Sequence, residues 1–250
     1  MKRYFLEVAY KGTNYAGFQV QKNAPTIQSK LEEALFTFYR VTFHLTGSSR
    51  TDAGVHALQN FFHVDADVKI EKDHLYNLNS ILPADIVLKT ARLVPSTIHC
   101  RFDALSRQYR YFIYNEKSPF LKDIAWYYPY PLSIETLNNA AGIIMANTDF
   151  TSFAKRNVQL NNFNCRIIES SWKHEDNCLV YTVKANRFLR GMVRALVATM
   201  LKVGRRRYSE EEFSKIFTEG DNNKLVDFSA PAHGLFLMGV EYPDDLLGLG

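Results

Sequence analysis

The chain has 250 residues, enough to bury a large core as one domain or as two smaller ones. It is 46 % hydrophobic and 22 % charged, as soluble globular proteins are, and has no run of about 18 uncharged apolar residues, which excludes a membrane-spanning helix. Its net charge of +4 is compatible with an RNA partner, and residues 187–207 hold seven basic side chains and no acidic one.

The cysteines form neither a CxxC pair nor a zinc-ligand spacing; they are Cys100, Cys165 and Cys178. We therefore expect no metal site, and a cytoplasmic rather than a secreted protein. The N-terminus begins with a strand-like run instead of the apolar core of a signal peptide. Phosphate-binding glycine loops, metalloprotease motifs and deaminase motifs are also missing from the sequence, so we expect side-chain chemistry without a nucleotide or other cofactor.

In the first half, alternating apolar residues predict strands over residues 3–10, 41–47, 59–64 and 86–93. A glycine-rich turn follows the first of them. Apolar residues at helical spacing predict one helix after Thr26, its expected N-cap, and another over residues 72–81. This β-α-β-β-α-β order is that of a ferredoxin-like unit, a plan shared by many RNA-binding sheets.

The second half is a variation on the same plan. Strands are predicted over residues 106–114, 166–174, 179–184 and 235–242, with a hairpin turn at Asp176-Asn177. Helices are predicted over residues 134–145 (capped by Ser133), 188–203 and 210–217. Because strands and helices do not strictly alternate, the sequence predicts an α+β fold. We place two α/β halves at residues 1–100 and 101–250, with a cleft between them.

One segment between two predicted strands concentrates the chemistry: Arg50-Thr51-Asp52-Ala53-Gly54-Val55-His56-Ala57. A cation and a carboxylate flank a hydroxyl residue there, and the glycine then allows a tight turn. A charged pair on a loop between buried strands is typical of a functional site. From the residue types alone, the favoured interpretation is a structural turn in which Asp52 caps the chain and Arg50 neutralises it.

This segment resembles the signature loop of the tRNA pseudouridine synthase A family. Further segments similar to that family follow in register: YKGTNYAGFQ (residues 10–19), TIQSKLEEAL (26–35), HCRFDA (99–104), RQYRY (107–111), DFTSF (149–153), NRFLRGMVR (186–194) and APAHGLFL (230–237). The resemblance extends over nearly the whole chain, from about residue 4 to residue 243. Phe18, where the family often has Trp, and Ser48-Ser49 depart from its usual pattern.

The resemblance implies a fold, an activity and a partner. The fold is the pseudouridine synthase fold, with two ferredoxin-like halves, a mostly antiparallel sheet and a central basic cleft. The activity is isomerisation of uridine to pseudouridine at positions 38, 39 and 40 in the anticodon stem-loop of tRNA, without metal or organic cofactor. The resemblance also implies a homodimer.

The resemblance assigns the catalytic roles to three residues. Asp52 is the carboxylate that acts as nucleophile or base. Arg194 is expected to pair with Asp52 and keep it ionised, since burial alone raises a carboxylate's pKa; a snorkelling surface Arg is the alternative. Tyr109 is expected to stack on the target base and to help remove the C5 proton. Tyr111 takes this place if the predicted strand register is wrong.

Basic residues near these positions are candidates for binding tRNA. Arg50 is expected to contact a phosphate or to fill the gap left by the turned-out base. Backbone contacts are expected from Arg101, Arg107, Arg187, Arg190 and Lys202, and a plain solvated surface is the alternative for the outer ones. Arg187, Arg190 and Arg194 recur at i, i+3 and i+7, so we expect them to share one helix face. For His56 and His63 we expect packing roles, because their flanks offer no ligating cysteine.

Two other classes of protein fit parts of this pattern. A non-catalytic RNA-binding or RNA-chaperone module on the same sheet would explain the basic residues, but such a protein gains nothing from a carboxylate beside the phosphates. A hydrolase with an Asp nucleophile is the weaker alternative, because the sequence offers no water-activating metal motif and no second paired carboxylate.

Overall fold

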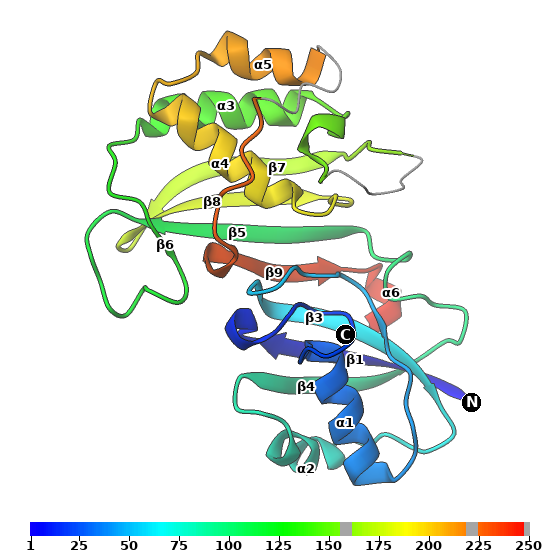
Figure 1. Ribbon diagram of the computed structural model, residues 1–250. Coiled ribbons are helices and arrows are strands. Elements are labelled where there is room, and N and C mark those ends of the chain that lie inside the picture. Colours follow the sequence, from blue (N-terminus) through cyan, green and yellow to red (C-terminus); the bar gives the residue numbers. More distant parts are fainter. Residues whose placement is uncertain (156–161, 219–224, 248–250) are drawn as a thin grey trace. The chain divides into compact units, whose positions relative to one another are not determined.

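Figure 1 shows the protein as a computed structural model, which describes residues 1–155, 162–218 and 225–247. The chain divides into two compact units: Met1–Ser106 with Phe236–Gly250, and Arg107–Leu235. The boundary after Ser106 lies close to the predicted one at residue 100, but the C-terminal segment belongs to the first unit. Among the described residues, no helix is long and apolar enough to cross a membrane.

The first unit contains β1 (Lys2–Tyr10), η1 (Gly12–Asn14), α1 (Ile27–Tyr39), β2 (Thr46–Gly47), β3 (His56–Ala66), α2 (His74–Ile81), β4 (Ile86–Val94), β9 (Leu235–Glu241) and α6 (Asp244–Leu247). Its sheet has the strand order β4-β1-β3-β9. β1 pairs antiparallel with both β3 and β4, and β2 pairs antiparallel with β3. β9 joins β3 in parallel, with His56 opposite Phe236.

Helix α1 forms where the sequence predicts it. Thr26 is the N-cap: its hydroxyl accepts the Ser29 N–H, and the Ser29 hydroxyl accepts the Thr26 N–H in return. This capping box satisfies two backbone donors that a helix start otherwise leaves open. The apolar residues at helical spacing, among them Leu31 and Leu35, are buried, so this face of α1 supplies part of the core.

The strand predicted over residues 41–47 is wrong in most of its length, because only Thr46–Gly47 pairs as β2. At Leu45, side chains of α1 replace a strand partner. The Leu45 N–H donates to Glu32 Oε1 at 3.0 Å, and the Leu45 carbonyl accepts from Gln28 Nε2 at 2.9 Å. Because side chains of α1 already form hydrogen bonds with the backbone N–H and C=O of Leu45, this residue does not pair with a neighbouring strand. The alternation of apolar residues in the sequence does not reveal such side-chain partners.

The second unit contains β5 (Ser106–Tyr114), β6 (Trp126–Tyr127), α3 (Ile134–Ala146), η2 (Thr151–Phe153), β7 (Ile167–Glu175), β8 (Cys178–Ala185), α4 (Met192–Gly204), α5 (Glu210–Thr218) and η3 (Ala232–Gly234). β8 pairs antiparallel with both β5 and β7, and β6 joins β5 in parallel. The predicted hairpin turn is confirmed, with Asp176 at a positive φ of 49°. These elements confirm the α+β class, whereas the cleft stays a prediction.

Helix α4 begins four residues later than predicted. Gly191 precedes it in the left-handed conformation, with φ 73°, so residues 188–190 lie outside the helix. Glycine adopts this conformation without steric cost, and the apolar character of residues 188–189 conceals the break. Arg187 and Arg190 therefore do not share a helix face with Arg194, and this part of the sequence-based prediction is wrong.

Candidate active site

The loop that carries Asp52 lies between β2 and β3, in the first unit. Asp52 is half-buried, and its carbonyl accepts the Val55 N–H at 3.2 Å, which closes a tight turn. Gly54 within this turn has φ 78°. The predicted glycine-dependent turn is therefore confirmed, and it presents a carboxylate that is neither deeply buried nor fully solvated.

Two glycines let the segment after β1 approach this loop closely. A Cβ on Gly12 would lie 2.0 Å from the Val55 carbonyl oxygen, so any side chain there would force the two segments apart. Gly17 has φ 114°, and a Cβ on it would lie 3.1 Å from the Thr51 carbonyl oxygen. The Phe18 N–H donates to that same oxygen at 3.1 Å. Residues 12–18 thus form a close-fitting support beneath the Asp52 loop.

Two of the predicted tRNA-binding residues lie in the same unit as Asp52. Arg50 and Arg101 are both exposed. The Arg101 guanidinium lies 5.8 Å from the ring centroid of Phe102, which is itself 75 % exposed. A cation beside an exposed ring can contact both a phosphate and a base, so this pair is suited to RNA.

Tyr109 and Tyr111 lie on β5 and face the same way, as strand alternation predicts. The Tyr109 ring meets Phe188 edge-to-face at 5.1 Å. Tyr111 is completely buried, and its hydroxyl donates to the Pro231 carbonyl at 2.7 Å. Burial raises the pKa of Tyr111, and the nearby Arg194 charge only partly opposes this. Tyr111 is therefore part of the core. Tyr109 is also buried, at 9 % exposure, and its expected role in the site stays a prediction.

Arg194 lies in the first turn of α4 and is half-buried. Its Nε donates to the Ala230 carbonyl at 2.6 Å, so the side chain turns inward rather than lying along the surface. Asp52 belongs to the first unit and Arg194 to the second. The expected ion pair between Asp52 and Arg194 stays a prediction.

The remaining basic candidates of the second unit differ in their surroundings. Arg107 is buried and donates from Nη1 to the Asn186 carbonyl at 2.8 Å. Arg187 is half-buried, and Arg190 is exposed. The Lys202 ammonium lies 3.3 Å from an Asp227 carboxylate oxygen, which offsets its charge. Arg190 is the most accessible of these four, and Lys202 the least suited to hold a phosphate.

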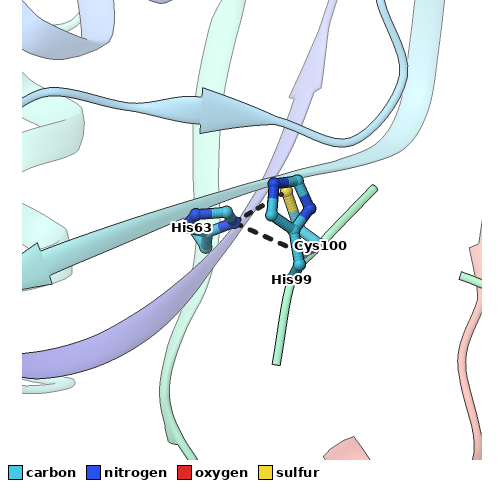
Figure 2. A group of neighbouring side chains, drawn as sticks. All are labelled: His63, His99 and Cys100. Atoms are coloured by element: carbon cyan, nitrogen blue, oxygen red, sulfur yellow. Dashed lines mark hydrogen bonds between the residues drawn. The ribbon is translucent and has the colours of Figure 1, made fainter. Parts of the chain in front are cut away.

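His63, His99 and Cys100 form a cluster that the sequence did not reveal (Figure 2). His63 Nδ1 lies 3.2 Å from Cys100 Sγ and accepts the Cys100 N–H at 3.3 Å. His99 Nδ1 accepts the Arg101 N–H at 3.1 Å. Each neutral imidazole has one nitrogen lone pair, and in both rings a backbone N–H occupies it. These hydrogen bonds give the cluster a packing role, and its three potential ligand atoms lie within 4.8 Å of one another.

The electrostatics of this cluster agree with such a packing role. Burial, with the nearby Arg3 charge, lowers the pKa of His63 to about 4 and also lowers the pKa of His99. Both rings are consequently neutral near pH 7. His56 also packs: its Nδ1 accepts the Gly12 N–H at 3.0 Å, and its ring lies 4.5 Å from that of Phe236. The packing role expected for His56 is confirmed. The role of His63 stays a prediction, because Cys100, a possible metal ligand, lies beside it.

A buried polar group that the sequence did not reveal lies beside the Asp52 loop and consists of Tyr10, Thr51 and Asn60. The Tyr10 hydroxyl lies 2.8 Å from Thr51 Oγ1, and Asn60 Nδ2 donates to the Tyr10 oxygen at 3.1 Å. One signal was available: Asn60 is an amide directly before Phe61-Phe62 in a strand, and a buried amide requires hydrogen-bond partners.

Comparison with known proteins gives this arrangement a context. A family model described as tRNA pseudouridine synthase matches residues 7–103 and 147–243. A tRNA pseudouridine synthase A of Azobacteroides pseudotrichonymphae genomovar. CFP2 is 39 % identical over 98 % of both chains. The proteins of that name from Parabacteroides distasonis and Staphylococcus aureus (strain MRSA252) are 40 % and 35 % identical, covering 98 % and 94 % of this chain and 98 % and 90 % of their own.

Among solved structures, an unknown protein from Galdieria sulphuraria aligns over 97 % of this chain and 98 % of its own, with 13 % identity and a TM-score of 0.24, which is too weak to inform on fold or function. The family model, in contrast, matches most of the chain. It includes the Asp52 loop, the segment beneath it, and the start of α4 with Arg194. With a model that matches most of the sequence and relatives near 40 % identity over almost its full length, the chain belongs to the tRNA pseudouridine synthase family.

Proposed function

We propose that this protein converts uridine to pseudouridine in tRNA, at positions 38, 39 and 40 of the anticodon stem-loop. The observation that carries the proposal is Asp52 itself, half-buried on a tight turn that is supported from below by residues 12–18. A module that only binds RNA has no use for a carboxylate held in this way, because a negative charge repels phosphates. Family membership supports the same conclusion.

The reaction breaks the C1′–N1 bond, turns the uracil, and joins C5 to C1′. It is redox-neutral, and one carboxylate suffices to attack C1′, to add to C6 or to take a sugar proton. In each case the acting form of Asp52 is ionised. We assign Arg194 to keep Asp52 ionised by its positive charge. We assign Tyr109 to stack on the uracil and to relay the C5 proton.

The binding of tRNA is assigned to Arg50, Arg101, Arg107, Arg187 and Arg190. Three of them, Arg50, Arg101 and Arg190, are exposed. Exposed guanidinium groups suit phosphate contacts, which position an RNA without reading its sequence. Modification of three neighbouring positions requires recognition that does not depend on sequence, because the anticodon arm must shift along the site to bring each target uridine to Asp52. We further propose that the protein is cytoplasmic and forms a homodimer. Light scattering after size-exclusion chromatography measures the molar mass and would test the homodimer.

The decisive experiment maps pseudouridine in uridine-containing tRNA transcripts after incubation with the purified protein. Matched transcripts carry cytidine at position 38, 39 or 40, and each should lose only the corresponding signal. Pseudouridine elsewhere would refute the assigned positions. Tight tRNA binding with no pseudouridine at all would support the non-catalytic RNA-binding module instead.

For Tyr109 we expect the Phe and Leu variants to differ. Tyr109→Phe keeps a ring that can stack on uracil, worth about 1–3 kcal/mol per base, so tRNA affinity should persist. Its rate should decrease by at most about 10²–10⁴-fold, which is the contribution of general acid–base catalysis. Tyr109→Leu should lose both affinity and rate. Single-turnover tritium release from 5-tritiated tRNA measures the rate.

Tyr111→Phe is the matched control for these variants. It removes a buried hydroxyl from the same strand face and should lower stability without slowing tritium release, since that hydroxyl is bonded to Pro231. If tritium release depends on the hydroxyl at Tyr111 and not at Tyr109, the assignment of the base-facing tyrosine is wrong. If neither hydroxyl matters, another group handles the C5 proton.

Turnover should be independent of bound metal. We expect full activity after the protein is treated with EDTA and then separated from the chelator by gel filtration, because none of the assigned roles requires a metal ligand. The assay then contains Mg²⁺ only to fold the tRNA, and elemental analysis verifies metal removal. An enzyme that stays folded but regains turnover only with added zinc would contradict the cofactor-free mechanism.

A further inference from the structure

We infer that Tyr10, Thr51 and Asn60 are positioning residues that hold Asp52 in its reactive place through one buried hydrogen-bond network. The inference rests on the proposed function, because it concerns how that reaction reaches its rate. None of the three needs to touch tRNA for this role. All three are buried: Tyr10 is 5 % exposed, Thr51 7 % and Asn60 0 %.

Asn60 acts on the backbone just before Arg50. Its Nδ2 donates to the Ser49 carbonyl at 2.8 Å, and its Oδ1 accepts the Ser49 N–H at 3.3 Å. The amide thus replaces a neighbouring peptide group and holds both polar groups of Ser49. Oδ1 also accepts the Phe61 N–H at 2.9 Å, and Nδ2 donates to the Tyr10 hydroxyl at 3.1 Å. The full hydrogen-bonding capacity of this side chain is used.

Tyr10 extends the network to the residue directly before Asp52. Because its oxygen accepts from Asn60, its single proton is free to donate to Thr51 Oγ1, 2.8 Å away. The Thr51 carbonyl accepts from Phe18 N at 3.1 Å. Thr51 is therefore held through both its side chain and its backbone, from β1 on one side and from the segment after η1 on the other.

The chain between Ser49 and Thr51 is consequently anchored at both ends, one peptide unit away from Asp52. Consecutive Cα atoms are about 3.8 Å apart, so the anchor at Thr51 restricts where the carboxylate can lie. A buried network centred on an amide whose hydrogen bonds are all made, as those of Asn60 are, confers rigidity that separate surface bonds do not. Displacement of a reacting group by about 1 Å costs about 100-fold in rate, even when binding persists.

The test uses Tyr10→Phe and Thr51→Val, each of which removes a hydroxyl while keeping the side chain's shape. We expect single-turnover rates at saturating protein to fall about 10- to 100-fold, with unchanged tRNA affinity in filter binding. Thr51→Ser keeps the hydroxyl and should retain the wild-type rate. The double variant Tyr10→Phe/Thr51→Val should be no slower than the slower single variant, because both remove the same bond.

Tyr181→Phe provides the matched control. Tyr181 is also completely buried, and its hydroxyl lies 2.9 Å from Ser170 Oγ in the core of the second unit. This variant should lower the melting temperature as Tyr10→Phe does, by about 2–4 °C, while keeping the wild-type rate. A rate loss confined to Tyr10→Phe and Thr51→Val supports a positioning role, since a merely structural bond would affect stability alone.

Equal rates for Tyr10→Phe and Tyr181→Phe would overturn the inference while leaving the proposed function intact. If Tyr10→Phe does not fold, the comparison of Thr51→Val with Thr51→Ser decides, and equal rates for these two overturn it. A wild-type protein that binds tRNA without forming pseudouridine overturns the proposed function, and this inference with it.

Discussion

Replacement of Asp52 by Asn is expected to abolish pseudouridine formation and to leave tRNA affinity nearly unchanged. The amide keeps the size of the carboxylate but cannot act as nucleophile or base. We expect the single-turnover rate to fall at least about 100-fold, equivalent to about 2.7 kcal/mol of barrier. Because the side chain is half-buried on a loop whose backbone bonds involve its neighbours, the fold should survive.

Asp67→Asn makes the same chemical change on the surface of the same unit and serves as the control. Asp67 is exposed, and its carboxylate lies 3.1 Å from the terminal amino group of Met1. This variant should retain the wild-type rate and affinity. An Asp52→Asn protein that keeps more than about a hundredth of the wild-type rate would disprove the catalytic role of the carboxylate. A loss of tRNA affinity equal to the loss of rate would make Asp52 a binding residue.

Arg194→Ala should reduce both turnover and stability. The stability loss arises within the second unit, because the bond from Nε to the Ala230 carbonyl disappears. We expect about 1.5 kcal/mol, the low end for a hydrogen bond to a charged group, since Arg194 is half-buried. The rate loss, at least about 100-fold, follows from the proposed charge support of Asp52.

A variant that keeps the positive charge separates these two effects. Arg194→Lys should retain more of the single-turnover rate than Arg194→Ala, because it still places a cation on α4. Both variants lose the bond from the guanidinium to the Ala230 carbonyl, so their losses of stability should be similar. A folded Arg194→Ala protein with the wild-type rate would refute the assigned pairing.

Local patterns predicted most of the regular structure of this protein. The cap at Thr26, the hairpin turn at Asp176 and the turn at Gly54 all depend on short-range chemistry, and each lies where the sequence places it. Predictions from local patterns were wrong where the structure of a segment depends on a hydrogen-bond partner distant in sequence or on the backbone angle of one residue. The strand expected over residues 41–47 is displaced by side chains of α1, and Gly191 delays the start of α4.

The candidate site shows the same division. The resemblance of the Asp52 loop to a family signature predicted the catalytic residue, and alternation along residues 106–114 placed Tyr109 and Tyr111 on one face. Only the structure showed the partner of the Tyr111 hydroxyl, because Pro231 is 120 residues away. Likewise, the contact of Cys100 with His63 joins residues 37 apart.

By itself, the sequence determined the fold class and the family, and it predicted the catalytic carboxylate, because periodicity, capping residues and a signature loop each extend over a short stretch of the chain. Tertiary structure alone decided that the last strand completes the first unit, where β9 pairs with β3. It also decided that Tyr10 and Asn60, 50 residues apart, meet beside Thr51. The physical reason is that hydrogen-bond partners in a sheet are chosen by packing of the whole chain, and no local pattern records that choice.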